Sequence, residues 1–136
     1  MKATIRSLSQ GERGSSLVEM ALVGLLLLTM VAGIVDLGRA YGNHVTLLNA
    51  SREGARYGSR FPFDRAGIDQ AVRQEAANSD LPVGDISTSV AGLHGAAGQP
   101  IGVTVQYDSP TILGALIGRP HITVQATTRM VIFGIE

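Results

Sequence analysis

The sequence predicts an α+β fold, with a long N-terminal helix and a short second helix packed on a small antiparallel sheet of about three strands. Three observations predict it. A long apolar run lies near the N-terminus, helical spacing continues beyond that run, and the apolar period changes to two in the second half of the chain. The chain has 136 residues, which is enough for one domain with an appended segment.

The apolar run extends from Ser15 to Val35 and contains a single charged residue, Glu19. As a helix it would be about 30 Å long, which is about the thickness of the hydrocarbon core of a bilayer. A leucine- and valine-rich run of this length favours a membrane helix over the buried helix of a soluble protein. We therefore predict a transmembrane or assembly helix over residues 15–36.

The flanks of this run predict its orientation. Residues 1–14 form a basic leader, which favours an N-terminus in the cytoplasm and a single-pass topology. The leader carries Lys2, Arg6 and Arg13 against Glu12, and Arg39 and Arg52 follow on the other side of the run. A secretory signal peptide is the competing interpretation, but there small residues follow the apolar core, whereas here Gly14 and Ser15 precede it.

Composition and motifs favour a non-enzymatic protein. The net charge is +0, so nothing favours nucleic acid as a partner, and the chain has no Cys. The three histidines, His44, His94 and His121, are far apart and form no metal-ligand pair. The sequence also lacks a Gly-x-Ser-x-Gly elbow and a phosphate-binding loop. We predict no catalytic residue, no metal site and no cofactor.

Helical spacing continues through residues 37–60. An apolar stripe includes Leu37, Tyr41 and Leu48 and fades beyond Leu48. A second set of positions holds small residues, which let a helix pack closely against a neighbouring element. That element is either the protein's own sheet or a neighbouring subunit. The small residues are Gly38, Gly42, Ala50, Gly54 and Gly58.

Residues 61–136 predict a small α+β head. Pro62 ends the long helix, and Asp64 can cap a second helix over residues 65–78. Period-two alternation then predicts strands over residues 86–90, 101–107 and from 122 to about 133. Residues 92–100 read as a loop. Residues 108–120 read as a connection whose short apolar turn, 112–117, would cover the edge of the sheet.

Several charged residues on the long helix have two interpretations. Asp36 and Arg39 are three residues apart at the outer end of the apolar run, so they can form a surface ion pair or contact another subunit. Arg52, Arg56 and Arg60 form a row at four-residue spacing, which is either solvated or binds an acidic patch on a partner.

The leader and the long helix resemble the TadE-like pseudopilins of the Tad (Flp) pilus system. The resemblance rests on the small-residue site at Gly14-Ser15, on Val18-Glu19, and on two segments further along the same helix. Those segments are Asp36-Leu37-Gly38-Arg39 and Asn49-Ala50-Ser51-Arg52-Glu53-Gly54-Ala55-Arg56. The resemblance covers about the first sixty residues.

The resemblance implies a pilin-like fold and a role as a minor pilin-like structural protein in an adhesive pilus. It implies that a prepilin peptidase cuts between Gly14 and Ser15, and that Glu19 then pairs with a processed N-terminus during assembly. It also implies a bacterial inner-membrane location, or an extracellular one in the pilus. The implied partners are the membrane, the peptidase, other pilin or pseudopilin subunits in a homo- or hetero-oligomer, and the assembly platform.

Two alternatives remain open at this point. The protein can be the main filament subunit, or a membrane-anchored binding module that is not processed and recognises a surface glycan or protein. An uncleaved leader and a monodisperse monomer in detergent would favour the binding module.

Overall fold

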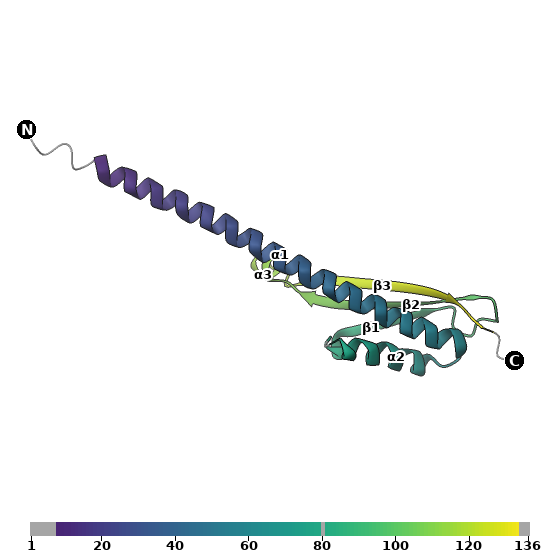
Figure 1. The fold of residues 1–136 in the computed structure, drawn as a ribbon. Helices are drawn as coiled ribbons and strands as arrows, with labels where there is room; N and C mark the ends of the chain where they lie inside the picture. The colour runs from purple at the N-terminus through teal and green to yellow at the C-terminus, as the bar shows by residue number, and fades with distance from the viewer. Residues whose placement is uncertain (1–7, 80, 134–136) are drawn as a thin grey trace, which may run out of the picture.

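The computed structural model describes residues 8–79 and 81–133, and residues 1–7 of the predicted leader lie outside this range. The longest element is α1, Leu8–Arg60, a continuous helix of 53 residues that is about 80 Å long at 1.5 Å per residue. Its C-terminal half lies against a small head, and its N-terminal half projects from that head (Figure 1). The predicted continuation of the long apolar helix through residue 60 is confirmed.

The head begins where α1 ends. Pro62 follows the last turn, and Asp64 then caps α2, Arg65–Asn78, by accepting a hydrogen bond from the backbone N–H of Gly67 at 2.8 Å. α2 buries Ile68, Val72 and Ala76. Both the bounds of this helix and its cap agree with the sequence prediction.

The sheet has three antiparallel strands in the order β1-β2-β3. After a short 3-10 turn, η1 (Val83–Asp85), come β1 (Ile86–Ala91), β2 (Pro100–Pro110), the short helix α3 (Ile112–Leu116) and β3 (His121–Val131). In register, Val90 lies opposite Val103, and Val103 lies opposite Thr128. The α+β plan with about three strands is confirmed.

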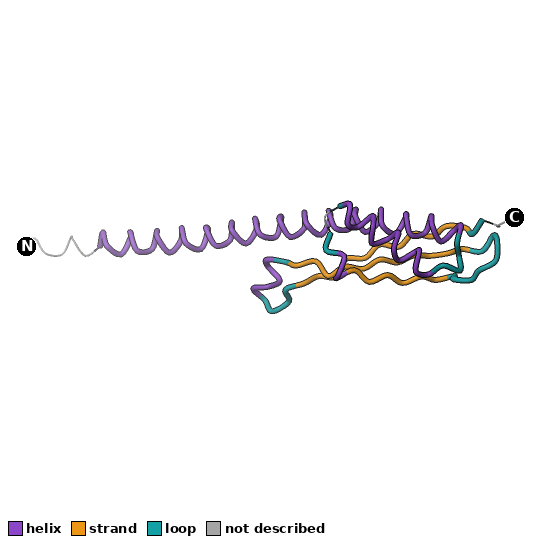
Figure 2. The backbone as a smooth tube through the Cα atoms, turned by 90° about the horizontal axis from the view of Figure 1, so that it is seen from below, coloured by secondary structure: helices purple, strands orange, loops and turns teal. Residues whose placement is uncertain are grey.

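The head is built in two layers (Figure 2). α1 and α2 lie side by side on one face of the sheet, and the core lies between them and the alternate residues of β2. Those β2 residues are Ile101, Val103, Val105 and Tyr107. The opposite face of the sheet carries no helix and presents polar side chains such as Thr104 and Thr127, whose hydroxyls are 2.8 Å apart.

The connection between β2 and β3 differs from the prediction. β2 continues to Pro110, because Asp108 accepts a hydrogen bond from the Thr123 hydroxyl at 2.6 Å and Ser109 is buried against α1. α3 does form within the predicted turn, but it does not cover the edge of the sheet. It lies at the end of the sheet, beside α1.

The buried face of α1 also differs from the predicted stripe. Leu37 and Tyr41 are 72% and 70% exposed, whereas Leu47 is fully buried and the buried positions after it hold small residues. These positions are Ala50, Ser51, Gly54, Ala55, Gly58 and Ser59. Small side chains are buried there because the helix lies close to α2 and to the sheet.

Candidate functional site

The predicted processing position lies at the start of the apolar half of α1. Gly14 and Ser15 are both helical and exposed, and a Cβ at Gly14 would meet no atom within 4 Å. The junction is therefore on the helix surface, well away from the head (Figure 1). Lys2 and Arg6 of the predicted leader lie outside the described residues.

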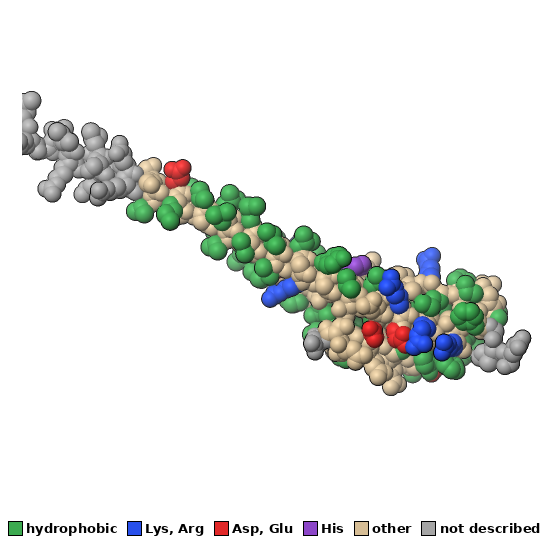
Figure 3. Space-filling model, viewed as in Figure 1, with side chains coloured by type: hydrophobic (Ala, Val, Ile, Leu, Met, Phe, Trp, Pro, Cys, Tyr) green, Lys and Arg blue, Asp and Glu red, His purple; other side chains and the backbone are tan. Residues whose placement is uncertain are grey.

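The apolar half of α1 projects from the head, and apolar side chains follow one another along the face that Figure 3 shows. Apart from Val35, which is 39% exposed, its large apolar side chains are more than half exposed, and none of its most apolar stretch is buried in the protein. They are Leu17, Val18, Met20, Leu22, Val23, Leu25, Leu26, Leu27, Leu28, Met30, Val31 and Ile34. The helix is long and apolar enough to cross a membrane, which suggests that it anchors the protein there.

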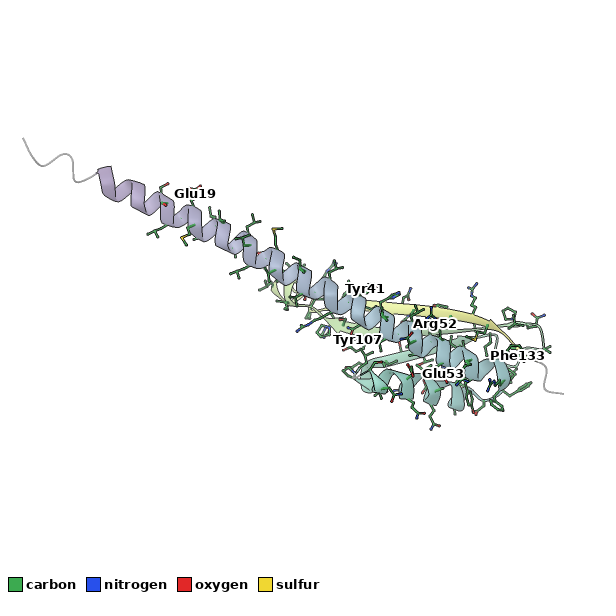
Figure 4. The ribbon with its side chains drawn as sticks, viewed as in Figure 1. Glu19, Tyr41, Arg52, Glu53, Tyr107 and Phe133 are labelled. Atoms are coloured by element: carbon green, nitrogen blue, oxygen red, sulfur yellow. The ribbon has the colours of Figure 1, made fainter. Side chains whose placement is uncertain are left out.

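Glu19 lies near the N-terminal end of this apolar half and is exposed on the helix surface (Figure 4). Ion pairs in the described part of the chain join Glu53 to Arg56 and Asp69 to Arg73, and neither includes Glu19. Its neighbours on the helix include the exposed apolar side chains of Val18, Met20, Leu22 and Val23. A buried environment around this segment would have to supply it with a cationic or hydrogen-bonding partner.

Asp36 has a partner that the sequence did not indicate. Its two carboxylate oxygens accept hydrogen bonds from the backbone N–H groups of Ile112 and Leu113, each at 2.8 Å. These contacts join the end of the apolar run to the first turn of α3. Within residues 8–79 and 81–133, Asp36 forms no salt bridge with Arg39.

The predicted row of small residues divides into two groups. A Cβ at Gly38 or Gly42 would meet nothing within 4 Å. A Cβ at Gly54 would lie 2.5 Å from Val72 Cγ2, and one at Gly58 would lie 2.8 Å from Ile101 Cδ1. The second group, with the fully buried Ala50, brings α1 close to α2 and the sheet. The first group stays open on the helix surface.

Polar side chains also fix α1 on the sheet. The hydroxyl of the fully buried Ser51 lies 2.7 Å from that of Thr128, and Asn43 donates to the Ser109 hydroxyl at 2.8 Å. His44 Nδ1 lies 3.1 Å from the carbonyl oxygen of Gln125. The sequence analysis missed these pairs. The one available signal was Ser51 itself, a small polar residue between the small apolar positions of α1.

The arginine row is exposed, and one of its members is paired within the chain. Arg56 donates to Glu53 on the same helix, which lowers the pKa of that carboxyl below its ordinary value and raises the pKa of Arg56. Arg52 and Arg60 take part in no ion pair that the described residues form. In that same part of the chain, no group of three or more acidic or histidine side chains is placed to hold a metal ion.

An apolar helix that projects from a two-layer α+β head defines a pilin-like protein. A family model described as TadE-like protein matches residues 14–56, from the predicted processing position to the second arginine of the row. The chain is therefore TadE-like over this segment, and the resemblance seen in the sequence is confirmed there. The match covers less than half of the chain, and it agrees with the pilin-like architecture of the fold.

No curated protein and no solved structure matches the chain.

Proposed function

We propose that this chain is a minor pilin-like subunit of a Tad pilus, processed between Gly14 and Ser15 and assembled through the apolar half of α1. One observation carries the proposal: the TadE-like match begins at Gly14, and the helix that follows it is left bare by the head. A helix of this kind is stored in the bilayer before assembly. On extraction, the same surface is buried against the helices of other subunits.

Glu19 has a specific role in this proposal. Removal of residues 1–14 makes Ser15 the first residue, and a free α-amine then lies about one helical turn from position 19. Pairing between the Glu19 carboxylate and the amine of a neighbouring subunit would satisfy both charges inside a packed bundle of helices. It would also fix the axial register of those helices, because an unpaired carboxylate there costs several kcal/mol.

Processing is tested by the intact mass of the protein purified from its native host. We expect the mass of residues 15–136, with Ser15 as the first residue. The mass of the full chain would contradict processing and would require another partner for Glu19.

Assembly is tested by the amount of the protein in the sheared pilus fraction. We expect Glu19→Ala to reduce that amount without changing the cleavage position, so that its mass is still that of a variant chain beginning at Ser15. Glu75→Ala, which removes a carboxylate from α2 in the head, is the matched control and should leave both unchanged. Equal incorporation of both variants would contradict the role of Glu19.

The same samples distinguish the proposed function from two others. A main filament subunit would be the most abundant pilin in the sheared fraction, whereas a minor subunit would be present at a small fraction of the amount of the main subunit.

A membrane-anchored binding module is favoured by the open polar face of the sheet, where Gln106 donates to Gln125 at 3.1 Å beside the Thr104–Thr127 pair. That function requires a full-length mass and a monomer in detergent.

A further inference from the structure

A second exposed apolar surface lies at the turn between β2 and β3. α3 and the residues after it carry apolar side chains that the head does not bury. Leu116 and Ile117 are 78% and 77% exposed, and Ile112 and Ile122 are 43% and 50% exposed. Scattered exposed apolar residues need no explanation, but these four belong to α3, the turn after it and the start of β3, which lie at the end of the head that faces the apolar half of α1 (Figures 1 and 2).

The position of α3 along α1 is fixed by direct contacts. Asp36 accepts hydrogen bonds from the first two N–H groups of α3, and a Cβ at Gly33 would lie 3.3 Å from Leu113 Cδ1. Gly33 belongs to the apolar run, and Asp36 is the first charged residue after it. α3 is thus held against the last turn of the segment that is suited to cross a membrane.

The length of the run places this turn at the surface of the bilayer. From Ser15 to Asp36 the helix rises about 30 Å, which equals the thickness of the hydrocarbon core. A bilayer that covers the apolar run therefore ends at the level of α3. Arg119, exposed in the same turn, would face the headgroups, where a cation is favoured near anionic lipid.

We propose that residues 112–117 and 122 form a membrane-contact patch, in which Leu116 and Ile117 insert into the interfacial region of the bilayer and fix the head against its surface. Asp36 positions the patch by holding α3. The proposal depends on the apolar half of α1 spanning the membrane, but it requires neither processing nor pilus assembly. It gives the head a preferred orientation on the bilayer before any extraction.

The absence of Cys makes a direct test possible, because each single-cysteine variant carries one label. Leu116→Cys and Ile117→Cys report on the patch. Phe133→Cys is the matched control, an apolar side chain that is 66% exposed at the opposite end of the head (Figure 4). Each full-length variant is labelled with an environment-sensitive fluorophore and reconstituted into phosphatidylcholine–phosphatidylglycerol vesicles.

We expect lipids that carry a nitroxide near the headgroup to quench labels at 116 and 117 several-fold more strongly than the label at 133. We expect aqueous iodide to give the reverse order. Equal quenching at the three positions by both agents would overturn the proposal, and so would stronger iodide quenching at 116 and 117.

Dilution distinguishes lipid from a second copy of the chain. If lipid covers the patch, quenching at 116 and 117 is independent of the protein-to-lipid ratio, down to one chain per vesicle. If a second copy covers the patch instead, the labels are protected from both quenchers at a high protein-to-lipid ratio and lose that protection on dilution, and this result would overturn the proposal. The result is independent of prepilin processing, so a full-length mass in the native host would leave it unaffected.

Discussion

The two halves of α1 share one continuous backbone and have opposite surroundings. Leu28, in the N-terminal half, is 70% exposed, and Leu47, in the C-terminal half, is fully buried in the head. Gly42 has open space around it, whereas Gly54 is in contact with Val72 and Val103. Residues of the same type therefore serve different purposes according to which half they occupy.

This difference separates folding from assembly within one helix. The C-terminal half is part of the core of the head, so its side chains contribute to the free energy of unfolding. The N-terminal half contributes almost nothing to that core. The head leaves its apolar surface exposed, and under the proposed function lipid covers that surface before assembly and other helices cover it afterwards. Substitutions in the two halves should therefore change different properties of the protein.

The largest effect is expected from shortening a buried leucine of α1. Leu47→Ala removes a side chain that is fully enclosed by the core, and such a change costs about 2–5 kcal/mol in the free energy of unfolding. We expect a large decrease in the melting temperature of the full chain in detergent, followed by near-ultraviolet circular dichroism of its tyrosines.

Leu28→Ala makes the same chemical change on the bare half of the helix. Because Leu28 contacts no part of the head, we expect the melting temperature of the head to stay at the wild-type value. A similar decrease in the melting temperature of both variants would contradict the division of α1 into two functional halves.

A smaller effect, in opposite directions, is expected at two glycines. Gly54→Ala would place its Cβ 2.5 Å from Val72 Cγ2 and 3.2 Å from Val103 Cγ1, and overpacking of this kind costs about 1–3 kcal/mol. Val72 is β-branched and buried in α2, so it has little freedom to move aside. We expect a lower midpoint in urea unfolding of the full chain.

Gly42→Ala is the matched variant on the open surface. Nothing lies within 4 Å of its new Cβ, and alanine favours a helix over glycine by about 1 kcal/mol. The midpoint should stay the same or rise. If Gly42→Ala instead blocks incorporation into the pilus while leaving the head stable, the open glycines are assembly contacts, as the sequence suggested.

Local sequence signals predicted much of this fold. Asp64 directly before a helical pattern predicts a helix cap, and apolar alternation in β2 predicts a strand, because each feature depends on residues close together in the chain. The membrane-type helix could be predicted equally well, because its prediction requires only the length and composition of the apolar run.

The buried face of α1 could not be predicted in the same way. Tyr41 fits a helical apolar stripe by spacing, yet the face that meets the head is set by where α2 and β2 lie. At this close approach large side chains do not fit, so glycine, alanine and serine form the contact. Hydropathy alone gives these residues little weight.

Contacts between segments that are far apart in the chain could not be predicted from the sequence either. Asp36 and Leu113 are separated by 77 positions, and Ser51 and Thr128 by the same number. Nothing in the local sequence pairs these residues, because the partner is decided by the path of the chain through α3 and β3. The membrane-contact patch depends on one of these contacts and could emerge only from the structure.

The smallest effect concerns the acid sensitivity of the head. Asp64 accepts hydrogen bonds from the backbone N–H of Gly67 and from the hydroxyl of Tyr57, each at 2.8 Å. These bonds favour the ionised carboxylate, so its pKa lies below the ordinary value of 3.8, and the pKa of Tyr57 is raised in turn. Glu19, on the bare half of α1, has no such contact with the head.

The sign of the effect follows from the lowered pKa of Asp64. Its stabilising contribution is complete above the unfolded-state pKa, and it is lost as the pH falls through the lower folded-state pKa. Asparagine can also cap a helix but does not titrate, so Asp64→Asn should flatten the fall in melting temperature between neutral pH and about pH 3. Glu19→Gln should leave that fall as steep as in the wild type, because the residue touches nothing in the head. An equal flattening in Glu19→Gln would mean that the two halves of α1 are coupled through charge even though they share no contacts.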